Sequence, residues 1–195
     1  MKNQNSKETN KGKAMMVGIF ILTAYFVLVS AVTTNGIIVL IFEILSGISV
    51  IGIAWILYPL FKSYGRKISL LYYLMKWIEG GIMIVGGIMY LGGTETLLEI
   101  RDLLYVIHAY IFIISAFLLY YLFIKSELIP KWLAIWGQVA VVLLLIGNIL
   151  ELSSQEIPIV IIGLCLSQIM LNEVVLAVYL IVAGFYKGKN QTNAD

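Results

Sequence analysis

The chain has 195 residues, of which 61% are hydrophobic and only 12% are charged, and its formal net charge is +2. Its mean hydropathy of +0.98 lies far outside the range of soluble domains, so the composition excludes a soluble globular enzyme and indicates an integral membrane protein. The single cysteine, Cys165, has no intramolecular partner, which excludes a disulfide framework.

The chain opens with a polar segment, residues 1–13, that carries four lysines and one glutamate and has no apolar periodicity. This composition predicts a disordered cytoplasmic tail. An apolar run follows over residues 14–33. Because it is longer than the apolar core of a secretory signal peptide, we expect it to remain as the first transmembrane helix.

Five further apolar runs are also long enough to cross a bilayer, since about 20 apolar residues span its hydrocarbon core. They cover residues 37–61, 68–92, 103–124, 132–152 and 157–186. The predicted fold is therefore all-α: a polytopic membrane protein with six transmembrane helices in one domain, residues 14–186. A short cytoplasmic tail, residues 187–195, completes the chain.

The basic residues predict the orientation of these helices. Eleven of the thirteen lysines and arginines fall on the side of the membrane that both termini share, one falls on the other side, and one lies within a span. By the positive-inside rule, both termini are expected in the cytoplasm. Topology thus accounts for the basic residues, which argues against nucleic acid as a partner.

The third apolar run contains two charges, Lys76 and Glu79, which lie three residues apart and so share one helix face. Each is unfavourable at the bilayer centre, by about 2.5–3.5 kcal/mol on insertion scales. They therefore require partners. Gly80 and Gly87 lie on the same side, where the lack of a side chain allows another backbone to approach closely. Close helix packing and a route for a substrate are both compatible with these glycines.

The remaining polar residues of the spans fall into two layers. Counted at about 1.5 Å per residue from the outer end, Glu43 and His108 reach a similar depth of roughly 8–9 Å and could meet. Arg101, Asp102, Asn148 and Glu151 lie near that level or above it. A second, central layer holds the two charges of the third run together with four further polar residues: Lys76, Glu79, Gln138, Gln168, Asn172 and Glu173.

We expect Lys76 to pair with Glu173 or Glu79, because an unpaired ammonium at that depth would lose its proton or extend toward the cytoplasmic interface. Protonation is the alternative state for the two glutamates, and carboxyls held between these states serve in proton relays. Polar groups in membranes also hold helices together, at about 0.6 kcal/mol per interhelical hydrogen bond. Both interpretations remain open for the central layer.

Several classes of site are not supported by the sequence. The chain has one histidine, which rules out a three-histidine zinc site or bis-histidine haem ligation within one subunit. It has no glycine-rich phosphate loop, nucleophile elbow or zinc-binding helix motif. We therefore predict no catalytic residues, metal or cofactor. The expected partners are the lipid bilayer and a small molecule or a proton.

Three stretches resemble a family of bacterial membrane proteins described as domain of unknown function 4386: FEILSGISVIGIAWILYPLFKSYGRKISLLYYLMKWIEGG, SELIPKWLAIWGQ and LNEVVLAVYLIVAGF. The resemblance aligns the family's recurring polar positions with Glu43, Lys76, Glu79, His108 and Glu173. At Lys76 the more familiar residue is arginine, which binds a carboxylate through two hydrogen bonds. The resemblance implies a six-helix protein of the bacterial plasma (inner) membrane and implies no activity.

Three functions are compatible with these observations. The leading hypothesis is a small permease-like or proton-coupled transporter with its site between the third and sixth spans. The second is a non-catalytic interaction or scaffold protein, in which the polar groups only fix the packing. The third is an intramembrane enzyme, or a binder of a lipid or hydrophobic cofactor, that uses Glu43 and His108 as acid and base and has an apolar pocket opening sideways.

Overall fold

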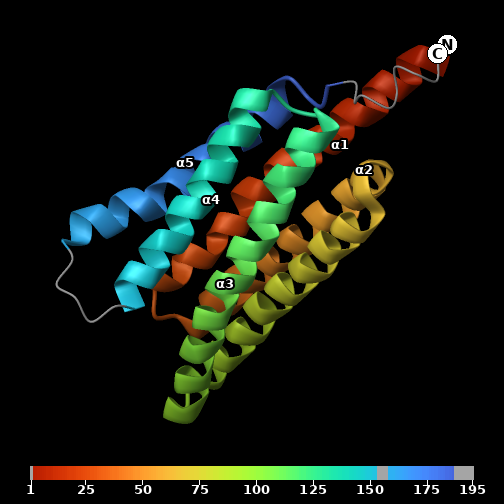
Figure 1. The fold of residues 1–195 in the computed structure, drawn as a ribbon. Helices are drawn as coiled ribbons and strands as arrows, with labels where there is room; N and C mark the ends of the chain where they lie inside the picture. The colour runs from red at the N-terminus through yellow and green to blue at the C-terminus, as the bar shows by residue number, and fades with distance from the viewer. Residues whose placement is uncertain (1, 153–157, 187–195) are drawn as a thin grey trace.

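The computed structural model describes residues 2–152 and 158–186, and all the regular secondary structure in this part of the chain is helical (Figure 1). Five of its helices are long and apolar enough to cross a membrane. In chain order the elements are α1 (Lys2–Ala24), the 3-10 helix η1 (Tyr25–Ala31), α2 (Gly36–Gly92), α3 (Glu95–Ser126), α4 (Lys131–Leu152) and α5 (Ile159–Val182).

Helix α2 is a hairpin of two antiparallel halves. Its backbone leaves the helical conformation at Gly65, where φ is 168° and ψ is 86°, and the chain then turns back on itself (Figure 1). The halves touch through glycine: a Cβ on Gly47 would lie 2.5 Å from the Gly80 carbonyl oxygen, and the converse holds for Gly80. The glycines predicted to admit a neighbouring backbone therefore do so between the second and third apolar runs.

Local capping sets where α2 and α3 begin. The Asn35 side chain accepts hydrogen bonds from the backbone N–H groups of Ile37 and Ile38, and the Thr94 hydroxyl accepts one from Leu97. Between the two helices, Gly93 adopts the left-handed conformation with φ of 63°, which glycine tolerates without strain. These caps produce two short connections at one end of the molecule.

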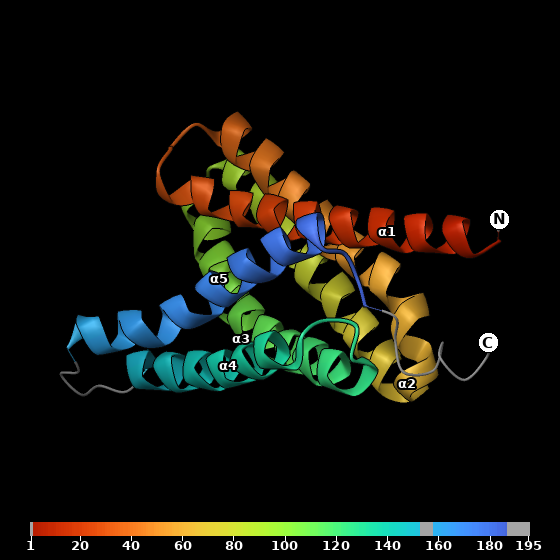
Figure 2. The same ribbon diagram turned by 90° about the horizontal axis from the view of Figure 1, so that it is seen from above.

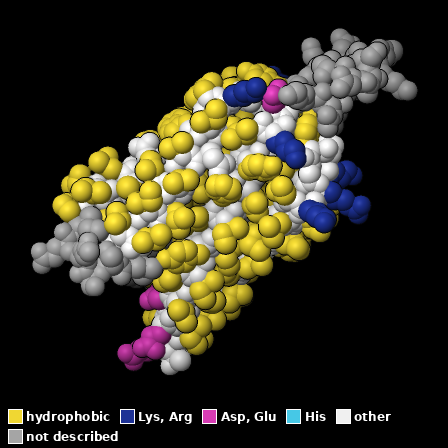
Figure 3. Space-filling model, in the orientation of Figure 1, with side chains coloured by type: hydrophobic (Ala, Val, Ile, Leu, Met, Phe, Trp, Pro, Cys, Tyr) yellow, Lys and Arg dark blue, Asp and Glu magenta, His cyan; other side chains and the backbone are white. Residues whose placement is uncertain are grey.

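Two further connections, the turn at Gly65 and residues 127–130 between α3 and α4, lie at the opposite end (Figure 1), which we call the basic end. The Gly65 turn lies close to the Lys125 ammonium, and the backbone N–H of Tyr186 donates to the carbonyl of Leu128 over 2.8 Å. Gly184 packs beside Lys11 of α1. Figure 3 shows lysine and arginine side chains concentrated at this end and acidic side chains at the far tip, with an apolar surface between them.

Two element boundaries differ from those predicted. The helix α1 begins at Lys2, whereas a disordered tail was predicted over residues 1–13. Extending an existing helix costs far less than nucleating one, so the apolar run can carry the helix into the polar segment. Helix α3 begins at Glu95, several residues before the predicted span. The predicted tail, residues 187–195, lies outside the described residues.

Buried aromatic rings pack together toward the basic end. Phe61 lies edge-on to Tyr72 across the α2 hairpin and to Phe123 of α3, with ring centroids 6.1 and 5.2 Å apart. The ring of Tyr120 of α3 packs directly against Gly137 of α4, where a Cβ would clash with the ring atoms. This aromatic core joins α2, α3 and α4. Figure 2 shows α4 and α5 extending away from the α2–α3 pair at the other end.

Candidate functional site

The charged pair predicted on the third apolar run forms inside the molecule. Lys76 Nζ lies 2.9 Å from Glu79 Oε1, and the two residues are 4% and 1% exposed. The hydroxyl of Ser115, on α3, donates to the other oxygen, Glu79 Oε2, over 2.7 Å. Of the two partners expected for Lys76, the structure selects Glu79. Both oxygens of this carboxylate therefore have partners.

Glu173 of α5 has a different environment. Its Oε2 accepts a 2.7 Å hydrogen bond from the hydroxyl of Tyr25, which η1 presents from the first apolar run. Within residues 2–152 and 158–186, no lysine, arginine or histidine forms an ion pair with it. Tyr25 was not predicted as a site residue. The signal was available, because a tyrosine inside a span needs a partner for its hydroxyl.

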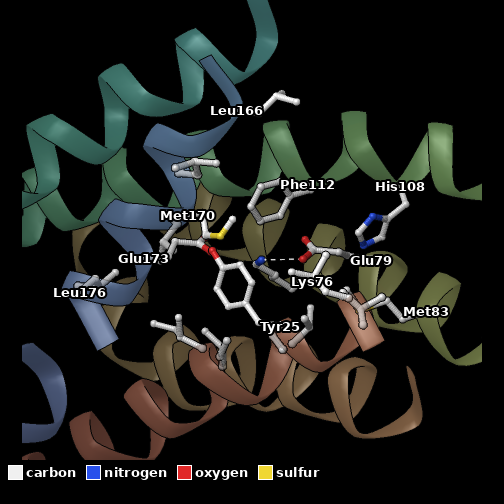
Figure 4. Close-up of a pocket in the computed structure, with 18 residues that line it drawn as sticks. Tyr25, Lys76, Glu79, Met83, His108, Phe112, Leu166, Met170, Glu173 and Leu176 are labelled. Carbon is white, nitrogen blue, oxygen red and sulfur yellow. Dashed lines mark hydrogen bonds and ion pairs between the residues drawn. The ribbon is translucent and has the colours of Figure 1, made fainter. Parts of the chain in front are cut away.

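Both carboxyls border one cavity of about 260 Å³, drawn in Figure 4. His108 and Phe112 project into it from α3, and the Lys76 ammonium lies 5.3 Å from the centre of the Phe112 ring. Apolar side chains supply most of the remaining wall. They include Met83 of α2 and four residues of α5: Leu166, Ile169, Met170 and Leu176.

The cavity reaches the lateral surface between η1 and α5. Leu28 of η1 and Met170 of α5 both line it, yet they are 53% and 42% exposed on the outside of the molecule. Nearer the basic end α1 and α5 are in contact at Gly18, where a Cβ would lie 2.6 Å from the Ala177 carbonyl oxygen. Within the described chain, the backbones of η1 and α5 do not come as close together as those of α1 and α5 do. We call this opening in the cavity wall, beside Leu28 and Met170, the lateral gap.

Glu43 belongs to a separate site. Its depth suggested that it could meet His108, but its Oε1 accepts a hydrogen bond from Arg101 Nη2. The Arg101 guanidinium lies over the rings of Tyr90 and Tyr105, 5.0 and 4.6 Å from their centroids. Residue counting predicts depth but not direction, and the long arginine side chain reaches inward to a carboxylate that His108 does not face.

Only part of the predicted central layer meets in the cavity. Asn172 is fully buried, but its amide nitrogen donates to the Leu133 carbonyl over 3.1 Å and so ties α5 to α4. Gln168 and Gln138 do not border the cavity either. Neighbouring helical positions point about 100° apart, so Asn172 and Glu173 cannot face the same way.

His108 lines the cavity and does not belong to the Glu43–Arg101 site. Its Nε2 is buried and has no hydrogen-bond partner within the described part of the chain, and its ring lies 5.6 Å from that of Tyr105. No three histidine, cysteine or acidic residues among those described come close enough together to hold a metal ion. Besides the Tyr25 phenol, the ionisable groups that border the cavity are the Lys76–Glu79 pair, the Glu173 carboxyl and the His108 imidazole.

The fold and this site define a membrane protein of long apolar helices, with an internal cavity lined in part by ionisable side chains. The family profile described as "Domain of unknown function (DUF4386)" matches residues 23–95 and 92–184, and the chain belongs to this family. This match confirms the resemblance seen in the sequence. No curated protein and no solved structure matches the chain.

Proposed function

We propose that the two halves of α2 cross the membrane separately, giving six crossings with both termini in the cytoplasm. The turn at Gly65 supports this topology, because residues 36–64 and 66–92 are each about 40 Å long at ~1.5 Å per residue, enough to span the ~30 Å hydrocarbon core. The concentration of lysine and arginine at the basic end supports its orientation. The resemblance favours a bacterial plasma membrane.

Within this topology, the cavity is proposed to bind a small, largely apolar molecule and pass it across the membrane, as a permease does. The observation that carries this proposal is that Glu79 and Glu173, which are far apart in the sequence, border one cavity. Carboxyls in such surroundings can exchange protons, which offers a means of coupling. The lateral gap gives an apolar solute a path from the bilayer.

The cavity also favours binding over a purely structural role. Protein interiors are packed as densely as organic crystals, and voids larger than a water molecule are few. A network that only held helices together would be expected to close around its polar groups. The enzyme hypothesis loses its acid–base pair, because Glu43 is engaged by Arg101 and does not border the cavity.

Three non-titrating probes of similar shape test the proposal: benzyltrimethylammonium, phenylmethanesulfonate and neopentylbenzene, which are a cation, an anion and a neutral molecule. We expect proteoliposomes to take up at least one of the two ions. Glu173→Gln should abolish this uptake, whereas Glu99→Gln, at an exposed site on α3, should not. No protein-dependent uptake, or equal uptake by Glu173→Gln, would contradict a permease that uses this carboxyl.

A second variant separates transport from folding. Glu79→Gln alone leaves the Lys76 ammonium without its carboxylate, so its loss of function would be ambiguous. The double variant Lys76→Met/Glu79→Gln removes both charges together and should insert normally. A scaffold role instead predicts that Glu173→Gln lowers the yield of folded protein.

A further inference from the structure

The charges that border the cavity do not balance. Lys76 and Glu79 neutralise each other at 2.9 Å, and Ser115 occupies the second oxygen of Glu79. Glu173 has only the neutral Tyr25 hydroxyl as a hydrogen-bond donor among the described residues. With every carboxyl ionised and His108 neutral, the cavity would carry one uncompensated negative charge, located on Glu173.

The remaining groups near Glu173 cannot supply the missing positive charge. Two fully buried tyrosines, Tyr72 of α2 and Tyr120 of α3, interact electrostatically with Glu173, and both are neutral. Among the described residues that line the cavity, only Lys76 and His108 are able to become cationic. Lys76 is already paired, and His108 faces Glu79 in Figure 4. The titratable groups facing Glu173 are Tyr25 of η1, Tyr72, Lys76 and Glu79 of α2, and His108 and Tyr120 of α3.

An uncompensated carboxylate is strongly disfavoured in surroundings of low dielectric constant. Two occupants restore neutrality equally well: a proton on Glu173, or a cation beside it. Because both neutralise the same oxygen atoms, they compete. The cavity is therefore suited to exchange one proton for one cation.

The walls define what kind of cation fits. A small metal ion needs several oxygen ligands, whereas most of the lining is apolar. The ring of Tyr25 offers a face that attracts organic cations, and the thioethers of Met83 and Met170 adapt to irregular shapes. A cavity of about 150 Å³ holds benzene in other proteins. The 260 Å³ here has room for a phenyl ring and a small headgroup.

We propose that this cavity binds a lipophilic organic cation, which enters between η1 and α5 and displaces one proton from Glu173. This inference rests on the small-molecule binding proposed above. In the exchange, the O–H bond of the Glu173 carboxylic acid breaks and its proton passes to water. The carboxylate left behind pairs with the incoming cation, so the net charge of the site is unchanged.

The test is calorimetric titration of the detergent-solubilised full chain with the same three phenyl probes. We expect benzyltrimethylammonium to bind roughly tenfold or more tightly than neopentylbenzene, a difference of about 1.4 kcal/mol. Its affinity should rise by about tenfold per pH unit over the range in which Glu173 is protonated in the empty cavity, and should level off above that range. Titrations in buffers of different ionisation enthalpy should show release of one proton per cation bound.

Variants locate the effect. Glu173→Gln keeps the Lys76–Glu79 pair and should remove both the preference for the cation and its pH dependence, whereas Glu99→Gln should bind as the wild type does. If Glu173→Gln does not fold, proton release by the wild type decides the question. Equal binding of neopentylbenzene, or cation binding without proton release, would overturn the inference and leave cavity binding intact. Binding of none of the three probes would overturn the proposed function as well.

Discussion

Replacing Lys76 by methionine tests whether its ammonium is what keeps Glu79 charged inside the protein. The lost attraction at 2.9 Å is at most about 6 kcal/mol for an effective dielectric constant of ~20. Protonating a glutamate with an ordinary pKa at pH 7 costs less, about 4 kcal/mol. The variant should therefore take up a proton on Glu79, and its free energy of unfolding should fall by about 3–4 kcal/mol at pH 7.

The sign of the pH dependence follows from this proton. The folded variant holds one proton more than its unfolded chain at pH 7, so lowering the pH stabilises it by about 1.4 kcal/mol per unit, and about 1 kcal/mol of the loss remains at pH 5. Unfolding in mixed detergent micelles, followed by circular dichroism, measures both values. Lys76→Met/Glu79→Gln should stay within about 1 kcal/mol of wild type. A loss for Lys76→Met below about 1 kcal/mol at pH 7, or one independent of pH, would refute this reasoning.

Two further predictions concern the fold. Gly80→Ala should lower the free energy of unfolding by about 1–3 kcal/mol, because its Cβ would meet the backbone of the other half of α2. The control Gly81→Ala should be neutral, because a Cβ there has no neighbour within 4 Å. Equal losses for the two variants would contradict the close contact of the two halves at Gly47 and Gly80. In a Cys165→Ser background, a membrane-impermeant maleimide should label Thr94→Cys in intact cells and Ser63→Cys only after lysis. The reverse pattern would contradict the proposed orientation.

Much of the fold was predictable from apolar length alone. Each predicted span corresponds to a helix or to half of one, and the polar interval that contains Gly65 marks the turn of α2. The start of α1 at Lys2 was not predictable, because helix extension from an apolar run into a polar segment leaves no mark in the composition. Apolar periodicity likewise did not distinguish α3 from the short connection before it.

The site was predictable where sequence spacing determines direction. Lys76 and Glu79 lie three apart on one helix, and that spacing made their pairing one of the two outcomes expected for Lys76. Contacts between helices were not predictable to the same degree. Depth counting brought Glu43 to the level of His108 but could not show that Arg101 reaches it instead. For Tyr25 the sequence shows that a hydroxyl inside a span needs a partner, but not that this partner is Glu173 of α5.

The account depends most on the cavity being a binding site, and filling it tests this directly. Ala24 lines the cavity, so Ala24→Phe would occupy it without removing any charge, whereas Ala31→Phe places the same ring at an exposed position of η1 that does not border the cavity. The measurement is the thermal unfolding midpoint of each variant with and without the three phenyl probes. We expect at least one probe to raise the midpoint of the wild type and of Ala31→Phe, and none to raise that of Ala24→Phe. A wild type that responds to no probe, or an Ala24→Phe variant that responds as the wild type does, would contradict binding in this cavity.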